Sequence, residues 1–412
     1  MKKVLVIGNY FFPDVASLGQ LITDFCLELR EDFEFNVIAA IPNYSSDVEL
    51  DKELMKKSYY DESVKGINVR RIIVPNVDKK NKISRIKYIL SYYLNSRKAI
   101  RHISEYDVIY TVSQPPILGG LLGKYAKKKN KSAKLIYNIQ DFNPEQIEAV
   151  KYSKLGLLIK ILKYIDTTSL KYSDKILLVG NDQLETLKKR NEKLLEKAIV
   201  INNWSDDKFI EPLEKNHPEV IEFKKKYNLL NKFVIMYSGN IGLFYDLENL
   251  IRVTKEFKDN KDIIFLFVGD GAVKKELENF KYENSLDNIV FAPYQPKDKL
   301  NISLNIADAH LVVNADGIKG VSVPSKLYGV MAAGKPVIGV LEDGSEARLI
   351  IEKAKCGKCV EPKNYTGFSK LIHDFYIDKD NVHNWGLKGR KYLEENLSKN
   401  ISISKYKELF ES

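Results

Sequence analysis

A serine and a lysine stand at the start of a helix-like segment, where they could bind an anion. The segment runs GVSVPSKLYGVMAAGKPVIGV (residues 320–340), with Ser325 and Lys326 directly after a proline. The first turn of a helix presents unpaired backbone N–H groups with about half a positive charge, and Lys326 adds a full one. This pattern favours a phosphate site. An ordinary helix capped by Ser325, with a solvated lysine, is the alternative that the segment leaves open.

The cysteines and histidines lack the spacing of a metal site. Cys356 and Cys359 form the one paired spacing, CGKC, and a single C-x-x-C without a second Cys or His pair is weak evidence for zinc or redox chemistry. The five histidines are scattered along the chain. We therefore expect structural cysteines, no cofactor and no obligatory metal.

Length and composition indicate a globular protein of two domains. The chain has 412 residues, of which 44% are apolar and 29% charged. It contains no run of eighteen apolar residues, and its N-terminus, MKKVLVIGNYFFPD, passes from two lysines directly into a strand without a small-residue cleavage site. We therefore expect a cytoplasmic protein.

Short apolar runs alternate with helical segments in two series, which predicts an α/β protein with two doubly wound parallel sheets. The first series is KVLVIGNY, FNVIAAI, NVRRIIV, DVIYTV, KLIYNI, KILLVG and AIVINNW; the second is KFVIMYSG, DIIFLFVGDG, NIVFAPY, AHLVVNA and KPVIGV. We expect one domain over 1–204 and another over 205–385, with terminal helices over 386–412 joining the first. Such sheets bind ligands at the carboxyl ends of their strands, so two facing domains would enclose a cleft.

The excess of positive charge lies in the first half of the chain. Residues 1–200 hold 34 Lys and Arg against 24 Asp and Glu, which accounts for the whole net charge of +10. The excess is clustered, because residues 79–101 carry eight basic residues and no acid. This asymmetry indicates an anionic partner for one half only.

Two other classes of protein fit the sequence less well. A dinucleotide-dependent oxidoreductase needs G-x-G-x-x-G after a strand, and neither VIGNYFFP nor VGDGAVKKE contains it. A non-catalytic sugar-binding protein of two domains would normally carry an export signal, and the sequence shows none.

Several motifs together resemble the GT-B retaining glycosyltransferases of family 4, over essentially the full chain. The resemblance is carried by YFFPD, PNY, QDFNPE, INNW, YSGNIG, VGDG and, most specifically, VPSKLYGVMAAGKPVIG. The chain is most similar to the bacterial branch that builds capsule, O-antigen and exopolysaccharide units. The resemblance implies a GT-B fold of two Rossmann-like domains and transfer of a hexosyl or N-acetylhexosaminyl group.

The resemblance also implies a nucleotide-sugar donor, a UDP-sugar, bound mainly by the second domain without an obligatory metal. Ser325, Lys326 and the backbone of Gly239 and Gly242 would hold the diphosphate, and Tyr294 would line the base. The donor-binding residues that it implies are Gly239, Asn240, Gly242, Gly269, Tyr294, Ser325, Lys326, Leu327 and Glu346.

The chain departs from the family pattern at four positions. Asn240 and Tyr245 stand where many members have an Arg and a Lys, which leaves Lys326 as the main cation for the leaving diphosphate. The paired glutamates of the family would fall near Val321 and Gly329, and neither residue is acidic. An epimerase or phosphorylase within GT-B therefore stays open.

The first domain would bind the acceptor, which the resemblance suggests is a lipid-diphosphate-linked saccharide. Asp141, in QDFNPE, ends a predicted strand and could take or orient the proton of the acceptor hydroxyl, with Glu145 as second choice. The same D-x-x-P-E pattern also fits an ordinary helix cap. The residues predicted on the acceptor side are Tyr10, Pro13, Ser17, Asn43 and Tyr44, of which the last two also fit an ordinary turn.

Two basic segments of the first domain could lie on an anionic membrane surface. KISRIKYILSYYLNSRKAIRHI repeats apolar residues at helical spacing between basic ones, and KLGLLIKILKYI repeats the combination. The apolar residues of the first segment are Ile83, Ile86, Leu90, Tyr93, Leu94, Ile100 and Ile103. We expect a peripheral protein at the inner face of the cell membrane and no nucleic-acid partner. The alternative is that both helices bury these stripes within the domain.

Overall fold

The computed structural model divides the chain into two compact α/β units. It describes residues 1–14, 16–42, 56–76, 82–103, 105–149 and 156–412. The first unit comprises Met1–Glu148, Ser153–Asn202 and Ser402–Ser412, and the second comprises Ala149–Tyr152 and Asn203–Ile401. The C-terminal helices thus belong to both units, whereas we expected all of 386–412 to join the first.

The first unit is built on one mixed sheet. Among the described residues this sheet has eight strands in the order β3-β4-β2-β1-β5-β6-β7-β8, and only β3 runs antiparallel to its neighbour. The strands are β1 (Lys2–Ile7), β2 (Phe33–Ala40), β3 (Tyr59–Val64), β4 (Ile67–Ile72), β5 (Val108–Val112), β6 (Lys134–Ile139), β7 (Lys175–Leu178) and β8 (Ala198–Val200).

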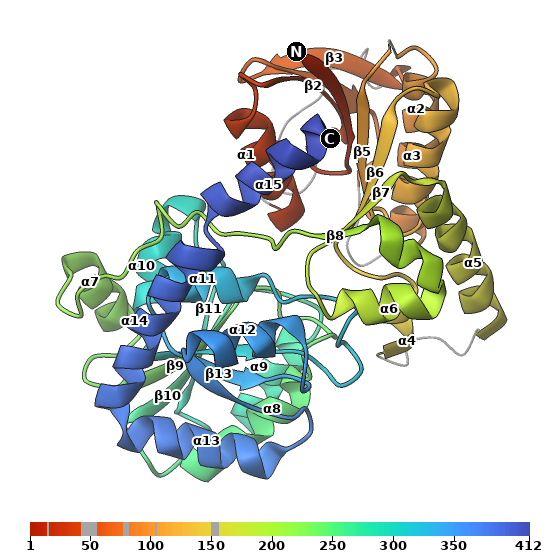
Figure 1. Cartoon of the computed structure of the whole chain (residues 1–412). Helices are drawn as coiled ribbons and strands as arrows, with labels where there is room; N and C mark the ends of the chain where they lie inside the picture. Colours follow the sequence, from red (N-terminus) through yellow and green to blue (C-terminus); the bar gives the residue numbers. More distant parts are fainter. Residues whose placement is uncertain (15, 43–55, 77–81, 104, 150–155) are drawn as a thin grey trace. The chain divides into compact units, whose positions relative to one another are not determined.

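Helices cover both faces of the first sheet. On one face α2, α3 and α5 lie side by side, and α1 and α15 cover the other (Figure 1). The helices are α1 (Ser17–Glu28), α2 (Lys82–Ile100), α3 (Leu118–Lys129), α4 (Glu145–Ala149), α5 (Gly156–Tyr172), α6 (Gln183–Arg190), the 3-10 helix η2 (Glu192–Lys197) and α15 (Lys399–Glu411).

Aromatic packing explains why the end of the chain returns to the first sheet. The ring of Phe25, from α1, stacks on Tyr406 of α15 with centroids 5.1 Å apart. Phe410 lies edge-on to Tyr110 of β5 at 5.9 Å. Because all four rings are buried, α15 completes the hydrophobic core of this unit.

The second unit is built on a wholly parallel sheet. Its six strands, counted over the described residues, have the order β11-β10-β9-β12-β13-β14. The strands are β9 (Phe233–Ser238), β10 (Ile263–Val268), β11 (Ile289–Ala292), β12 (Ala309–Val313), β13 (Val337–Val340) and β14 (Gly357–Val360). Val234 and Met236 of β9 enter one core while Ile235 and Tyr237 enter the other, so both faces are buried.

The helices of the second unit complete its two cores. They are α7 (Pro218–Lys226), α8 (Leu247–Val253), η3 (Thr254–Phe257), α9 (Lys274–Glu283), η4 (Lys297–Lys299), α10 (Leu300–Asn305), α11 (Lys326–Ala332), α12 (Glu346–Ala354), α13 (Tyr365–Ile377) and α14 (Lys379–Asn396). α14 packs against α11 and α12, which explains why it stays with this unit (Figure 1). The two sheets confirm the predicted α/β class with Rossmann-like units.

The strand orders show where each unit is built to hold a ligand. Strand order reverses between β9 and β12 in the second sheet and between β1 and β5 in the first. In doubly wound sheets ligands bind outside the carboxyl ends of the strands at such points. The loops that follow β9 and β1 therefore lie at the expected position in each unit.

Candidate active site

Two glycines shape the loops at the carboxyl end of the second sheet. Gly239 follows β9 with a φ of 133°, and Gly269 follows β10 with a φ of 144°, values that residues with a side chain rarely adopt. A Cβ on Gly269 would lie 2.0 Å from the carbonyl oxygen of Gly239, so the two loops touch backbone to backbone. Only glycine permits this approach, which leaves the backbone of the β9 loop open toward Lys326.

Lys326 projects from the first turn of α11 toward two aromatic rings, those of Tyr237 in β9 and of Tyr245 in the loop that follows it. Its Nζ lies 3.9 Å from the ring centroid of Tyr237 and 4.1 Å from that of Tyr245. The same Nζ donates a hydrogen bond to the hydroxyl of Tyr237 at 2.7 Å. A Cβ on Gly239 would lie 3.8 Å from this Nζ. The ammonium is thus held by cation–π contacts beside the glycine loop.

The surroundings of Lys326 shift its protonation. Burial lowers the pKa of Lys326 to about 7. The described residues place no carboxylate within ion-pair distance of its Nζ, so the two rings and the hydroxyl are the contacts that hold it. Burial, together with the nearby Tyr245 and Tyr294, raises the pKa of Tyr237 well above its usual value. An anion at this point would favour the charged form of the lysine.

The neighbours of Lys326 in sequence differ in what they can offer a ligand. Ser325 occupies the position before α11 and is exposed, but its side chain makes no capping hydrogen bond, so the predicted side-chain cap is wrong. The side chain of Leu327 is wholly buried in the core, and only its backbone could meet a ligand. A donor contact from Leu327 would therefore come from its backbone.

The other predicted donor residues come from the same end of the sheet. Tyr294 follows β11 and is half exposed, while Glu346 begins α12 after β13 and is buried. Asn240 is exposed, and its carbonyl oxygen accepts a hydrogen bond from Tyr237 at 2.6 Å. A Cβ on Gly242 would lie 2.7 Å from the side-chain nitrogen of Asn240, which is exposed and can move aside, so crowding does not require a glycine there.

The two positions where the family has glutamates hold no acid here. Val321 is buried, and Gly329 lies within α11. A Cβ on Gly329 would meet Leu304 at 3.5 Å and the hydroxyl of Ser205 at 3.6 Å, which are ordinary contacts. The glycine is therefore not required by crowding.

In the first unit, Asp141 lies two residues after the end of β6 and is half-buried. Its backbone and that of Gln140 are held by Ser113, whose hydroxyl accepts from Gln140 N at 3.1 Å. Ser113 itself follows β5, so the carboxyl ends of two neighbouring strands fix this loop. The placement is the one expected for a carboxylate at a ligand-binding edge.

Glu145 is occupied by an ion pair that the sequence did not reveal. Both of its carboxylate oxygens accept hydrogen bonds from Arg190 of α6, at 2.5 and 2.6 Å. Arg190 also lies 3.6 Å from Asp166, whose other oxygen accepts from Tyr137 at 2.8 Å. Burial raises the pKa of Asp166 to about 6. The network indicates that Glu145 fixes the conformation of the 141–145 segment. This argues against Glu145 as the residue that takes the proton of the acceptor hydroxyl.

The loop after β1 carries the predicted acceptor residues and is anchored by a buried arginine. Tyr10 is half-buried, whereas Pro13 and Ser17 are exposed. Arg71 of β4 is 1% exposed; it pairs with Glu62 at 2.6 Å and donates to the carbonyl oxygen of Phe12. Sequence reasoning missed Arg71, because nothing in a strand pattern signals a buried charge. The predicted contacts Asn43 and Tyr44 lie outside the described residues.

The cysteines have the character of core residues. Burial raises the pKa of both Cys356 and Cys359 to about 12, so both thiols stay protonated near neutral pH. Over the part of the chain that the structure describes, no three His, Cys, Asp or Glu side chains gather as a metal site would require. Likewise, no helix among those residues is both long and apolar enough to cross a membrane.

The two Rossmann-like units have the architecture of the GT-B fold, and in the second unit the two glycine loops and Lys326 lie at the strand-order reversal. Residues 219–392 match the family model described as glycosyl transferases group 1, and the second unit is such a domain. The chain is 25% identical over 334 residues to a probable glycosyltransferase, WbjE of Pseudomonas aeruginosa, covering 81% of each.

Further comparisons agree with this assignment. The chain is 24% identical over 406 residues to a putative colanic acid biosynthesis glycosyl transferase, WcaI of Escherichia coli K12, covering 96% of this chain and 97% of that protein. It also shares the fold of Anabaena Alr3699/HepE, solved in complex with UDP and glucose, with a TM-score of 0.74 and 13% identity over 100% of both chains. The protein is a glycosyltransferase.

Proposed function

We propose that this protein is a retaining glycosyltransferase that moves a sugar from a UDP-sugar to a lipid-diphosphate-linked saccharide during surface polysaccharide biosynthesis. The transferred sugar is a hexose or an N-acetylhexosamine. The observation that carries the proposal is the ammonium of Lys326, held between two tyrosine rings beside Gly239. The polysaccharide role is supported by WcaI, whose name assigns it to colanic acid biosynthesis, and the nucleotide by the UDP complex of HepE.

In this proposal Lys326 neutralises the diphosphate as it leaves. The acceptor oxygen forms a bond to the anomeric carbon while the bond from that carbon to the diphosphate oxygen breaks on the same face. The hydroxyl proton passes to the departing phosphate, and Asp141 orients the hydroxyl. The protein then contributes positioning and charge stabilisation more than a nucleophile. Tyr237 and Tyr245 preorganise the cation, so that little reorganisation is needed as charge develops on the diphosphate.

Other residues at this end of the second sheet complete the proposed donor site. Tyr294, half exposed after β11, offers a ring to the base, and the exposed Ser325 offers a hydroxyl to the diphosphate. The N–H groups of Gly239 and Ile241 already donate to the carbonyl oxygens of Val268 and Asp270, so we propose that Asn240 and Gly242 supply the backbone N–H groups for the diphosphate. Glu346 is proposed to bind the sugar or ribose hydroxyls, in place of the acids that positions 321 and 329 lack.

Donor use is the experiment that tests this proposal. We expect the full chain to release UDP from one UDP-sugar of a panel that also contains ADP-, GDP- and dTDP-sugars, when it is given a lipid-linked saccharide acceptor. We propose that no metal is required, because Lys326 supplies a cation for the diphosphate, and expect the rate to survive EDTA. Turnover of none of these donors, or a complete loss that Mg²⁺ or Mn²⁺ restores, would count against the proposal.

The first unit presents two exposed aliphatic stripes that suit a membrane surface. On α2, Ile83, Ile86, Leu90 and Leu94 are between 52% and 63% exposed, while the opposite face, with Tyr88 and Tyr92, is buried in the core. On α5 the exposed side chains are Leu157, Leu158, Ile161 and Tyr164. The alternative that α2 buries this stripe is therefore wrong for these four residues, whereas it holds for Ile100, which is buried.

The basic residues beside these aliphatic stripes favour an anionic membrane surface as their partner. α2 and α5 both pack against α3, whose last turn carries Lys127, Lys128 and Lys129 (Figure 1). Arg85 and Lys87 on α2 are exposed beside the aliphatic stripe. Basic residues near an anionic leaflet contribute about 1 kcal/mol each. We propose that this face lies on the anionic cytoplasmic leaflet, where a lipid-linked acceptor would be presented.

Co-sedimentation with liposomes tests the membrane proposal. Wild-type protein should sediment with anionic vesicles at low salt, and less at high salt or with neutral vesicles. Ile86→Ser with Leu90→Ser should reduce the bound fraction several-fold, because both side chains are exposed and their loss leaves the core intact. Ile377→Ser, at an aliphatic side chain 67% exposed in the second unit, is the matched control. Equal sedimentation of all three proteins would contradict the proposal.

A further inference from the structure

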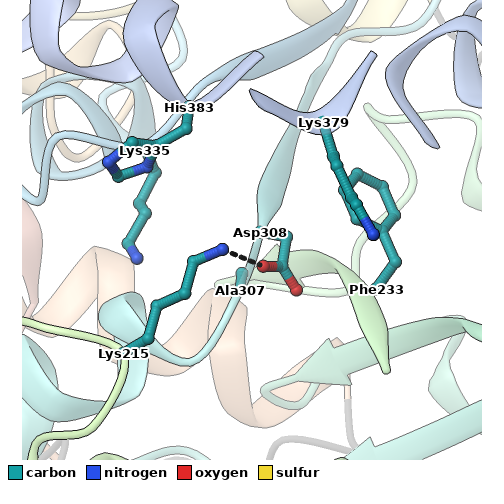
Figure 2. Close-up of a pocket in the computed structure, with 7 residues that line it drawn as sticks. All are labelled: Lys215, Phe233, Ala307, Asp308, Lys335, Lys379 and His383. Atoms are coloured by element: carbon teal, nitrogen blue, oxygen red, sulfur yellow. Dashed lines mark ion pairs between the residues drawn. The ribbon is translucent and has the colours of Figure 1, made fainter. Parts of the chain in front are cut away.

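A small cavity opens at the edge of the second sheet opposite the candidate active site. Its volume is about 30 Å³, and its lining includes Phe233, the first residue of β9, and Asp308, directly before β12 (Figure 2). Gly239 and Lys326 lie at the carboxyl end of β9. A strand of six residues is about 20 Å long, so the cavity is separate from the donor site.

The cavity contains a buried lysine. Lys335 follows α11, is 8% exposed and donates a hydrogen bond to the carbonyl oxygen of Asn305 at 3.0 Å. Within the described residues no carboxylate lies within ion-pair distance of its Nζ, although an ammonium can donate three hydrogen bonds. Burial lowers the pKa of Lys335 to about 8, with Lys224 and Lys215 contributing in the same direction and Asp308 opposing them.

Cations outnumber the single acid in the lining. Three lysines, Lys215, Lys335 and Lys379, line the cavity with one carboxylate, that of Asp308, and His383 completes the charged and polar lining. Figure 2 shows the ammonium groups of Lys215 and Lys335 ending on one side of Asp308 and that of Lys379 on the other.

The carboxylate of Asp308 already accepts a hydrogen bond from the backbone. One of its oxygens accepts a hydrogen bond from the backbone N–H of Val234 at 2.9 Å, which fixes the start of β9. The other lies 3.8 Å from the Nζ of Lys215, a loose pair with a side chain 74% exposed. A carboxylate in this position cannot neutralise three lysines, so the cavity keeps a net positive charge.

We propose that this cavity is a second anion site, which binds inorganic phosphate or the phosphoryl group of a small phosphate ester. By the usual measure a cavity of this volume has room for about two water molecules, which suits a tetrahedral oxyanion and excludes a nucleoside. A phosphate would accept the remaining N–H groups of Lys335 and bridge it to Lys215 and Lys379.

Such a bridge would join elements that are distant in sequence. Lys215 precedes α7, Lys335 follows α11, and Lys379 begins α14. α14 is already fixed to the end of α11, because Arg390 donates to the carbonyl oxygen of Ala332 at 2.8 Å. A bound anion should therefore stabilise the second unit against unfolding.

Thermal unfolding of the full chain, at constant ionic strength, tests this site. Relative to chloride, phosphate at about five times its dissociation constant should raise the melting temperature of wild type by about 2–4 °C. Lys215→Gln with Lys379→Gln should abolish the rise, and these exposed side chains can be changed without opening the core. The control, Lys353→Gln with Lys388→Gln, removes the same amount of charge from exposed positions on α12 and α14. Phosphate should still raise the melting temperature of this control.

Further arms separate the two anion sites and the two sources of the phosphoryl group. Because the two sites are independent, phosphate should still raise the melting temperature of Lys326→Ala. The Lys215→Gln, Lys379→Gln double variant should still bind UDP. Glycerol 3-phosphate should act more weakly than phosphate if the free ion is the ligand and more strongly if an ester is. The proposal would be overturned if neither probe raised the melting temperature. It would also be overturned if the rise persisted in the Lys215→Gln, Lys379→Gln double variant or disappeared in Lys326→Ala.

Discussion

Sugar transfer by the Lys326→Ala variant is expected to be slower than wild type by a factor of about 100 or more. Loss of a preorganised donor to a developing negative charge typically costs about 3 kcal/mol in the barrier. Lys326 is the cation that the structure places beside Gly239, and Asn240 and Tyr245 supply no replacement. Turnover at saturating UDP-sugar, measured by UDP release, is the appropriate assay.

The fold should tolerate this change, which makes the result interpretable. Tyr237 keeps its hydrogen bond to the carbonyl oxygen of Asn240, and no described carboxylate within ion-pair distance depends on the lysine. The melting temperature should therefore fall by little. Lys353→Ala, at an exposed position of α12, is the matched control and should leave the rate unchanged. Activity of Lys326→Ala within twofold of wild type would remove the lysine from the mechanism.

Asp141→Asn is expected to lower turnover by about 100-fold while leaving the affinity for the donor unchanged. Asp141 orients the acceptor hydroxyl in our mechanism, and loss of such a positioning contact can cost about 100-fold in rate. Asp141 belongs to the first unit, after β6, whereas the proposed donor residues all belong to the second. The effect should therefore appear in kcat and in the KM for the acceptor.

Two neighbouring carboxylates serve as controls for Asp141. Glu148, on α4, pairs with Lys163 at the surface, so Glu148→Gln should have almost no effect on the rate. Glu145 is paired with Arg190, so Glu145→Gln should act mainly through the melting temperature. If Asp141→Asn weakened UDP binding and left turnover at saturation unchanged, its assignment to the acceptor would be wrong.

The sheets were largely predictable from the sequence, because strands buried on both faces appear as continuous apolar runs. The two strands that were missed lack this signal. β3 has the sequence YYDESV and lies at the edge of the first sheet, with exposed acids, and β14 has only four residues and begins with glycine. A Cβ on Gly357 would lie 2.0 Å from the carbonyl oxygen of Val337, so β14 depends on a contact that no local pattern encodes.

The candidate site was predictable only in part. Lys326 stood out because its local pattern is unusual, but Tyr237 looks like an ordinary buried residue of a strand until Lys326 is placed 89 positions away. Similarly, the pairing of Glu145 with Arg190 spans 45 positions, and the basic cavity joins lysines from three separate segments. Sequence patterns report on neighbours along the chain, whereas these sites are formed by the fold.

Calorimetric titration with UDP across pH tests most directly whether Lys326 binds the diphosphate. The pKa of Lys326 is about 7 without ligand, and a bound diphosphate would raise it. Binding above that pH should therefore take up a proton. The terminal phosphate of UDP, with a pKa of about 6, is already ionised in this range. UDP affinity should then fall by up to about tenfold per unit as the pH rises from about 7 to about 9.

The same titration with uridine, which carries no phosphate, should show no such pH dependence. Lys326→Ala should bind UDP about 100-fold more weakly than wild type at about pH 7. Tight UDP binding with proton uptake in wild type, and its loss in the variant, is the result that our account predicts. UDP affinity that is equal in the two proteins and constant across this pH range would contradict it.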